Sequence, residues 1–242
     1  MLAIYKKELR SYFTGPIGYI YVALYLLVAS LIFTYTTLYA GTCSVTTYYT
    51  FLLYLFAILI PLLTMRMLSE EKKTRTEQIL LTSPVSLYGV ILAKFLAAFT
   101  LFSGTLLASC LHFITLYVYG KEDAYGNPKL NIPIVFSTTL GILLIGAAFV
   151  AIGIFVSACT ENQLVAALIT IVAIASTLVL NVLSYYVTFT PLRVVMRWFS
   201  VFDRFYAFTY GYFDFVALLY YLSVAVIFLF LTVRVLEKRR WA

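Results

Sequence analysis

The sequence predicts an all-α integral membrane protein, and three observations lead to this fold class. Of its 242 residues, 63% are hydrophobic and only 11% are charged, whereas a soluble domain carries about 25% charged residues. The chain also contains 21 Tyr and 20 Phe, and aromatic rings are enriched at membrane boundaries. Finally, the apolar residues are grouped in long runs that contain almost no charge. Lipid is therefore the solvent that this chain fits.

Six of these apolar runs are long enough to cross a bilayer as helices. The hydrocarbon core is about 30 Å thick, so a spanning helix needs about 20 apolar residues. A charged group at the centre of such a helix costs about 3 kcal/mol, and these runs keep their charges at the ends. We expect one transmembrane domain over residues 1–242, with spans at residues 17–39, 51–68, 95–119, 133–158, 164–186 and 213–233.

The basic residues are distributed unequally between the two sides of these spans. One side holds twelve Lys and Arg, and the other holds five, namely Lys121, Lys129, Arg193, Arg197 and Arg204. The positive-inside rule therefore predicts that both termini and the loop 69–94 are cytoplasmic, in a multi-pass protein of the plasma or inner membrane. The net charge of +7 is not gathered in a basic stripe, so we expect a lipid environment and no nucleic-acid partner.

The loop after the second span is the most informative segment. Its first half is charged, and its second half contains an apolar edge at residues 79–81. Glu71 and Arg75 have the i,i+4 spacing that supports a helix, and Ser83-Pro84 is a typical start of the next helix. The pattern predicts a short helix across the cytoplasmic face. A solvated loop whose charges only fix the topology is an equal alternative.

Three segments resemble a known family. Residues 76–85 (Thr-Glu-Gln-Ile-Leu-Leu-Thr-Ser-Pro-Val), followed by Leu-Ala-Lys-Phe at 92–95, are similar to the motif after the second span of ABC-2 type permeases, the membrane subunits of ABC transporters. Residues 5–19 resemble the amphipathic entry helix of that family, and residues 152–163 resemble its turn between the fourth and fifth spans. The likeness is greatest to small permeases of the gliding-motility type. Arg75 and Ala93 depart from the pattern, because many members carry Gly there.

The resemblance implies a coupling helix at about residues 69–83 that docks on a cytoplasmic ABC ATPase. ATP and Mg would be bound by that partner, this chain would bind no cofactor, and a second permease chain, identical or related, would complete an ATP-driven exporter. The implied ATPase contacts are Glu70, Glu71, Arg75, Glu77, Gln78, Leu80 and Leu81. A smaller second contact is implied at Thr160, Glu161, Asn162 and Gln163, and Glu8 and Arg10 of the entry helix would brace the coupling helix.

Sequence motifs for catalysis are missing from the chain. There is no GxxxxGK[ST], HExxH or GxSxG, and His112 is the single histidine. We therefore expect no enzyme activity, no metal site and no nucleotide site in this chain. Two further functions stay open: a mechanical or anchoring subunit that passes ATP-driven motion to an outer partner, and a proton-coupled carrier. The second would need acids within the spans, which the sequence lacks.

Four local features complete the sequence-based expectations. His112 is expected to be a neutral imidazole bonded to a neighbouring helix, and Pro61 to produce a packing kink; neither is assigned a role. The fourth and fifth spans are rich in Gly and Ala, which predicts close helix packing within the chain. Residues 185–215 combine aromatic rings with arginines, which predicts helices that dip into the outer interface, as an outer lid or as an aromatic belt.

Overall fold

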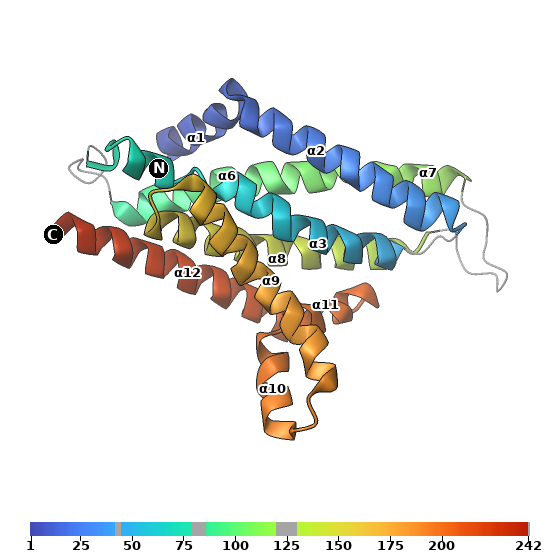
Figure 1. Cartoon of the computed structure of the whole chain (residues 1–242). Coiled ribbons are helices and arrows are strands. Elements are labelled where there is room, and N and C mark those ends of the chain that lie inside the picture. Colours follow the sequence, from blue (N-terminus) through green and yellow to red (C-terminus); the bar gives the residue numbers. More distant parts are fainter. Residues whose placement is uncertain (42–44, 79–85, 120–129, 242) are drawn as a thin grey trace.

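In the computed structural model, which describes residues 1–41, 45–78, 86–119 and 130–241, the chain is a bundle of long helices (Figure 1). Within these residues, six helical segments are long and apolar enough to cross a membrane, which confirms the predicted fold class. They are Pro16–Tyr39, Val45–Lys73, Leu87–Tyr119, Ile132–Cys159, Gln163–Tyr186 and Phe215–Arg240.

The helices have the following bounds. The first half of the chain forms α1 (Leu2–Thr14), α2 (Pro16–Phe33), the π-helical turn η1 (Thr34–Tyr39), α3 (Val45–Thr64), α4 (Ser69–Lys73), α6 (Leu87–Ser109) and α7 (His112–Tyr119). The second half forms α8 (Ile132–Cys159), α9 (Gln163–Tyr186), α10 (Thr190–Phe199), α11 (Val201–Thr209) and α12 (Phe215–Trp241). The predicted entry helix is therefore α1, and the aromatic segment 185–215 contains two short helices, α10 and α11.

Three spans differ clearly from their predicted limits. The second begins at Val45 and not at residue 51. The third span begins earlier, at Leu87, and is interrupted at Cys110 and Leu111, between α6 and α7. At this break the Nδ1 atom of His112 lies 2.8 Å from the carbonyl oxygen of Ser109, and the imidazole stacks on Phe33 with ring centroids 5.2 Å apart. The histidine thus bonds within its own segment and not to a neighbouring helix. The last span begins at Phe215, and its helix α12 continues to Trp241, with Lys238, Arg239 and Arg240 in the last turn.

Helix α8 is the centre of the bundle. It packs against α3, α6, α9, α11 and α12, and its glycines allow this close approach. A Cβ atom added to Gly146 would lie 2.1 Å from Phe102 Cε1, and one added to Gly153 would lie 2.1 Å from Thr64 Oγ1. The predicted role of small residues in the fourth span is thus confirmed: they bring two neighbouring spans to within contact of the α8 backbone.

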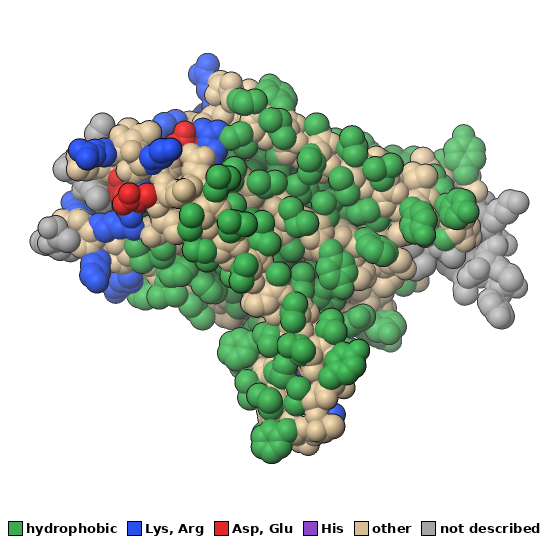
Figure 2. Space-filling view, in the orientation of Figure 1, with side chains coloured by type: hydrophobic (Ala, Val, Ile, Leu, Met, Phe, Trp, Pro, Cys, Tyr) green, Lys and Arg blue, Asp and Glu red, His purple; other side chains and the backbone are tan. Residues whose placement is uncertain are grey.

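Charged and apolar side chains occupy different parts of the surface. Figure 2 shows most of the visible Lys, Arg, Asp and Glu gathered at one end of the bundle, while hydrophobic side chains dominate the rest of the visible face, apart from a basic side chain on the lower projection. This end contains α1, the junction between α3 and α4, the start of α6, the turn at residues 160–163 and the end of α12. We call it the charged end.

Candidate functional site

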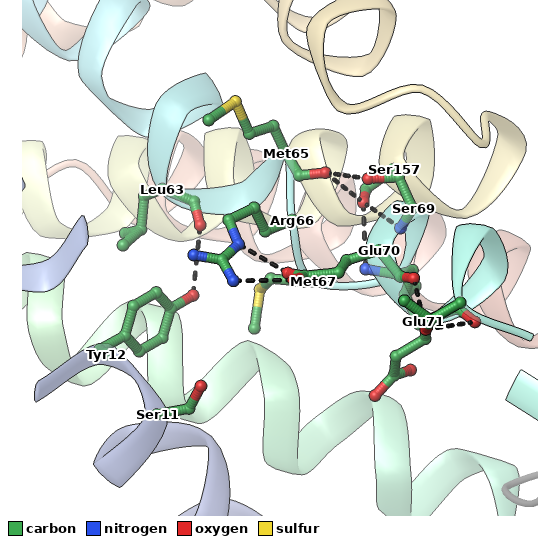
Figure 3. A network of polar contacts seen from close by, with 12 residues as sticks. Ser11, Tyr12, Leu63, Met65, Arg66, Met67, Ser69, Glu70, Glu71 and Ser157 are labelled. Atoms are coloured by element: carbon green, nitrogen blue, oxygen red, sulfur yellow. Dashed lines mark hydrogen bonds and ion pairs between the residues drawn. The ribbon is translucent and has the colours of Figure 1, made fainter. Parts of the chain in front are cut away.

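The junction between α3 and α4 is fixed by a serine on the central helix α8. The Ser157 hydroxyl donates to the carbonyl oxygen of Met65 at 3.1 Å and accepts from the backbone N–H groups of Leu68 and Ser69, each at 3.1 Å (Figure 3). A helix leaves its last carbonyls and first N–H groups without intrahelical partners. One buried hydroxyl here satisfies groups from both helices, so the turn between α3 and α4 is held in one geometry.

Lys94 of α6 is the most buried charged residue at this end, with a side chain only 1% exposed. Its Nζ atom donates to Glu8 Oε1 at 3.0 Å, to Glu71 Oε1 at 2.7 Å and to the Met67 carbonyl oxygen at 2.9 Å. An ammonium group has three N–H donors, so this set of acceptors is complete. Lys94 therefore joins α1, the α3–α4 junction, α4 and α6 at one point.

Helix α1 makes a further contact with the same junction. The Tyr12 hydroxyl donates to the carbonyl oxygen of Leu63 at 3.2 Å, and Arg66 forms two hydrogen bonds with Glu70, at 2.6 and 2.9 Å (Figure 3). Burial raises the pKa of Tyr12 above its ordinary value, so the phenol stays neutral and remains a donor. The entry helix is thus attached to the junction by both Glu8 and Tyr12.

The segment after α4 is bound to the C-terminal helix. Arg239 of α12 donates to Glu77 Oε1 at 3.1 Å and also to the carbonyl oxygen of Ala158, near the end of α8. The side chain of Glu77 is 12% exposed. Cations are favourable beside helix C-terminal carbonyls, so Arg239 links the end of α8 to the loop after α4.

The turn between α8 and α9 lies beside α4. Lys72 forms an ion pair with Glu161 at 3.0 Å, and Asn162 caps α9 by accepting the Leu164 N–H at 3.0 Å. The two ATPase contacts that the family resemblance implied are therefore adjacent in space, although about ninety residues separate them in the chain. Together they form one surface at the charged end.

The structure divides the sequence-predicted residues into two groups. Arg75, Gln78, Glu161, Asn162 and Arg10 are exposed, whereas Glu8, Glu71 and Glu77 turn inward to the basic residues described above, and Glu70 pairs with Arg66. Thr160 and Gln163 are half-buried in the turn. Leu80 and Leu81 lie outside the described residues.

The predicted coupling helix is not continuous. Helix α4 ends at Lys73, and a turn follows in which Arg75 adopts φ 58°, in the left-handed region. This conformation favours glycine, so Arg75 holds its place in the turn at a cost in backbone strain. The i,i+4 pair of Glu71 and Arg75 predicted from the sequence does not form, because Glu71 bonds to Lys94 instead.

A cleft of about 580 Å³ opens between α1, α4 and α6. Its ionic lining is balanced, with three bases and three acids: Lys7, Arg66, Lys94, Glu8, Glu70 and Glu71. Most of these groups already pair with one another. Among the described residues, no group of three His, Cys, Asp or Glu is placed to hold a metal ion. The chemistry available here is therefore ion pairing and mechanical attachment.

Comparison with known protein families identifies the family of this chain. A family model described as an ABC-2 family transporter protein matches residues 12–236. The chain belongs to this family. No curated protein matches the sequence. Membership makes the chain a permease, the membrane subunit of an ABC transporter, and its six spans agree with this assignment.

Three residues that organise this permease's charged end were not predicted to do so. Lys94 was noted as a cytoplasmic charge and as part of the 92–95 motif, Arg239 as one of the cytoplasmic basic residues, and Ser157 as part of the 152–163 stretch, and none of them was assigned a contact. One available signal was the presence of several acids at the same end as many bases, because acids near a membrane boundary are costly unless they are paired.

Proposed function

We propose that this permease is driven by a separate cytoplasmic ABC ATPase that docks on the charged end, and that it moves its substrate in the direction of export. The docking surface consists of the exposed residues of segment 69–78, which contains α4, and of the 160–163 turn. An ion pair between Lys72 and Glu161, at 3.0 Å, joins the two segments. The charged end then faces the cytoplasm, with both termini. This agrees with the excess of basic residues on that side.

The observation that carries the proposal is the attachment of residues 69–78, which comprise α4 and the segment after it, to their surroundings. Through Lys94, Glu71 of α4 is linked to α1 and α6; through Arg239, Glu77 after α4 is linked to α8 and α12. A force applied to residues 69–78 would therefore reach several spans through charge-assisted hydrogen bonds, which are about twice as strong as neutral ones. A solvated loop that only fixed the topology would not need these buried contacts.

Residues 69–78 separate into those that bind the rest of the permease and those that face outward. Glu71 and Glu77 are committed to internal partners, so they attach the docking element to the permease. Arg75 and Gln78 are exposed, so they are the residues of this segment that we assign to the ATPase surface. The ATPase would supply ATP and Mg, and a second permease chain would complete the pathway through the membrane.

Co-purification in mild detergent tests the proposal. The tagged permease is expressed with the ABC ATPase encoded beside it, and the wild type is compared with Lys73→Glu/Arg75→Glu. Both of these side chains are exposed, so the permease should remain folded while the ATPase is lost. The matched control is Lys6→Glu/Lys7→Glu on α1, which reverses the same number of exposed charges at the same end and should keep the ATPase.

Labelling of Cys159 gives a second measurement. Cys159 is exposed beside the 160–163 turn, and in a Cys43→Ser/Cys110→Ser background it reacts alone. Bound ATPase should slow its reaction with a maleimide, and Lys73→Glu/Arg75→Glu should restore the rate. The docking surface would be wrong if the double variant kept the ATPase as well as the wild type does, or if bound ATPase left the rate unchanged.

A further inference from the structure

Helix α10 is exposed along its whole length. None of its residues from Thr190 to Phe199 is buried. It packs against the end of α9, and Figure 1 shows these two segments projecting away from the other helices, with α10 running across the direction of the bundle. A ten-residue helix has little stability on its own in water, so we expect the apolar side of α10 to be buried against lipid or another molecule.

The side chains of α10 are sorted onto two faces. Leu192, Val195 and Phe199 follow the spacing of one helical stripe and are each about half exposed or more. Arg193 and Arg197 are four residues apart and share the opposite face. A helix with an apolar stripe, an aromatic side chain and a basic face is typical of a helix lying in the plane of a membrane boundary.

Arg193 and Arg197 have no acidic partner among the described residues. In the part of the chain that the structure describes, every ion pair lies at the charged end, and none includes Arg193 or Arg197. Arg197 instead lies 5.9 Å from the Tyr185 ring, at the end of the fifth span. Guanidinium groups match phosphate geometry well, so Arg193 and Arg197 could bind a phosphate next to the end of the fifth span.

From this arrangement we propose that α10 is an interfacial helix whose Arg193 and Arg197 bind the headgroups of anionic phospholipids. Its apolar stripe lies among the acyl chains, and its basic face meets the phosphates. A second copy of the chain is not the partner that covers α10. Two packed α10 helices would bring four arginines together, and α10 contains no acid to offset their repulsion. The inference does not depend on ATPase docking.

The fluorescence of Trp198 tests this proposal in the full-length chain. Trp198 lies on α10 and is 64% exposed, and Trp241→Phe removes the other of the two tryptophans. The protein is reconstituted in phosphatidylcholine vesicles containing either brominated phosphatidylglycerol or brominated phosphatidylcholine at equal mole fraction. We expect stronger quenching by phosphatidylglycerol, with a relative affinity of at least about fivefold, the factor that each cation near an anionic surface contributes.

Matched variants identify the residues responsible. Arg193→Gln/Arg197→Gln should reduce the preference to near one, Arg193→Lys/Arg197→Lys should keep most of it, and Lys238→Gln/Arg240→Gln at the other end should leave it unchanged. Equal quenching by both lipids in the parent protein would overturn the proposal, as would a preference that survives the glutamine double variant. A Trp198 shielded from both lipids would also overturn it, because a protein partner would then cover this face.

Discussion

The two ends of the molecule hold their charges in different ways. At the charged end, the buried Lys94 bonds to two carboxylates, and Arg239 bonds to a third. At the other end, Arg204 of α11 lies over the rings of Tyr220 and Trp198, at 4.1 and 5.4 Å, and forms no ion pair among the described residues. Ion pairs between buried groups are costly to break, whereas a cation over aromatic rings is cheaper to replace. The charged end is thus the mechanically linked one.

The largest expected effect comes from Lys94→Met. Removal of the ammonium leaves Glu8 and Glu71 close together and largely buried without their common partner. Breaking a buried ion pair in this way costs about 3–5 kcal/mol. We expect a large drop in the apparent melting temperature in detergent, measured by thiol-reactive dye fluorescence. Lys73→Met, on an exposed lysine at the same end, is the control and should change little.

A triple variant sharpens this prediction. Lys94→Met/Glu8→Gln/Glu71→Gln removes the charges together and should recover part of the lost stability, because no buried charge remains unpaired. If the single variant were as stable as the wild type, Lys94 would not be the central attachment point that the geometry indicates.

The next effect in size is expected for Arg239→Met. This change removes the partner of Glu77 and the group that bonds to the Ala158 carbonyl oxygen. Hydrogen bonds to charged groups contribute about 1.5–3 kcal/mol, so we expect a loss of about 2 kcal/mol in the same melting assay. The stability of Arg239→Lys should lie between that of the wild type and that of Arg239→Met, because lysine keeps the positive charge but lacks the planar set of donors of a guanidinium group. Equal stability of all three proteins would contradict the assigned contacts.

A smaller effect is expected at the opposite end, for Arg204→Leu. The cation–π contacts contribute about 0.5–2 kcal/mol, but the buried Nε atom of Arg204 has no hydrogen-bond partner in the described part of the chain, and leucine removes that cost. The net loss should be about 1 kcal/mol or less. A loss as large as that of Lys94→Met would show that the two ends do not differ in the way proposed.

The smallest effect is expected for Arg75→Gly, and its sign is informative. Arg75 has φ 58°, a conformation that costs a residue with a Cβ atom about 1–2 kcal/mol of stability. Glycine removes this strain, but it lowers stability by about 0.5–1 kcal/mol because the unfolded chain becomes more flexible. We expect unchanged or slightly raised stability, together with weaker ATPase binding if Arg75 belongs to the docking surface. A clear loss of stability would mean that the Arg75 side chain holds the turn.

The spans were predictable from the sequence because each depends on a local run of apolar residues. The number of spans and their order were correct, and the main errors lay at the ends. The break at Cys110 and Leu111 could not be predicted, because no Pro or Gly stands there and the hydropathy continues through it. Similarly, the turn at Arg75 interrupts a segment whose charges had the correct spacing for a continuous helix.

The candidate site was predictable in position but not in its internal contacts. The charged loop and the 160–163 turn were identified from local motifs, and they lie together in the structure. The partners of Glu77 and Lys94 could not be identified in this way. Arg239 is 162 residues from Glu77, and Glu8 is 86 residues from Lys94. Such pairs depend on how the helices pack, which the positive-inside rule does not address.

The closed set of contacts around Lys94 also limits how this chain can evolve. The ammonium has three donors and meets three acceptors, so its loss leaves Glu8 and Glu71 without their common cation. A change of Glu8 or Glu71 alone to glutamine keeps an acceptor oxygen and leaves Lys94 paired with the other carboxylate. Among relatives, we therefore expect a lysine at position 94 wherever positions 8 and 71 are both acidic, while position 8 or position 71 alone can change to glutamine.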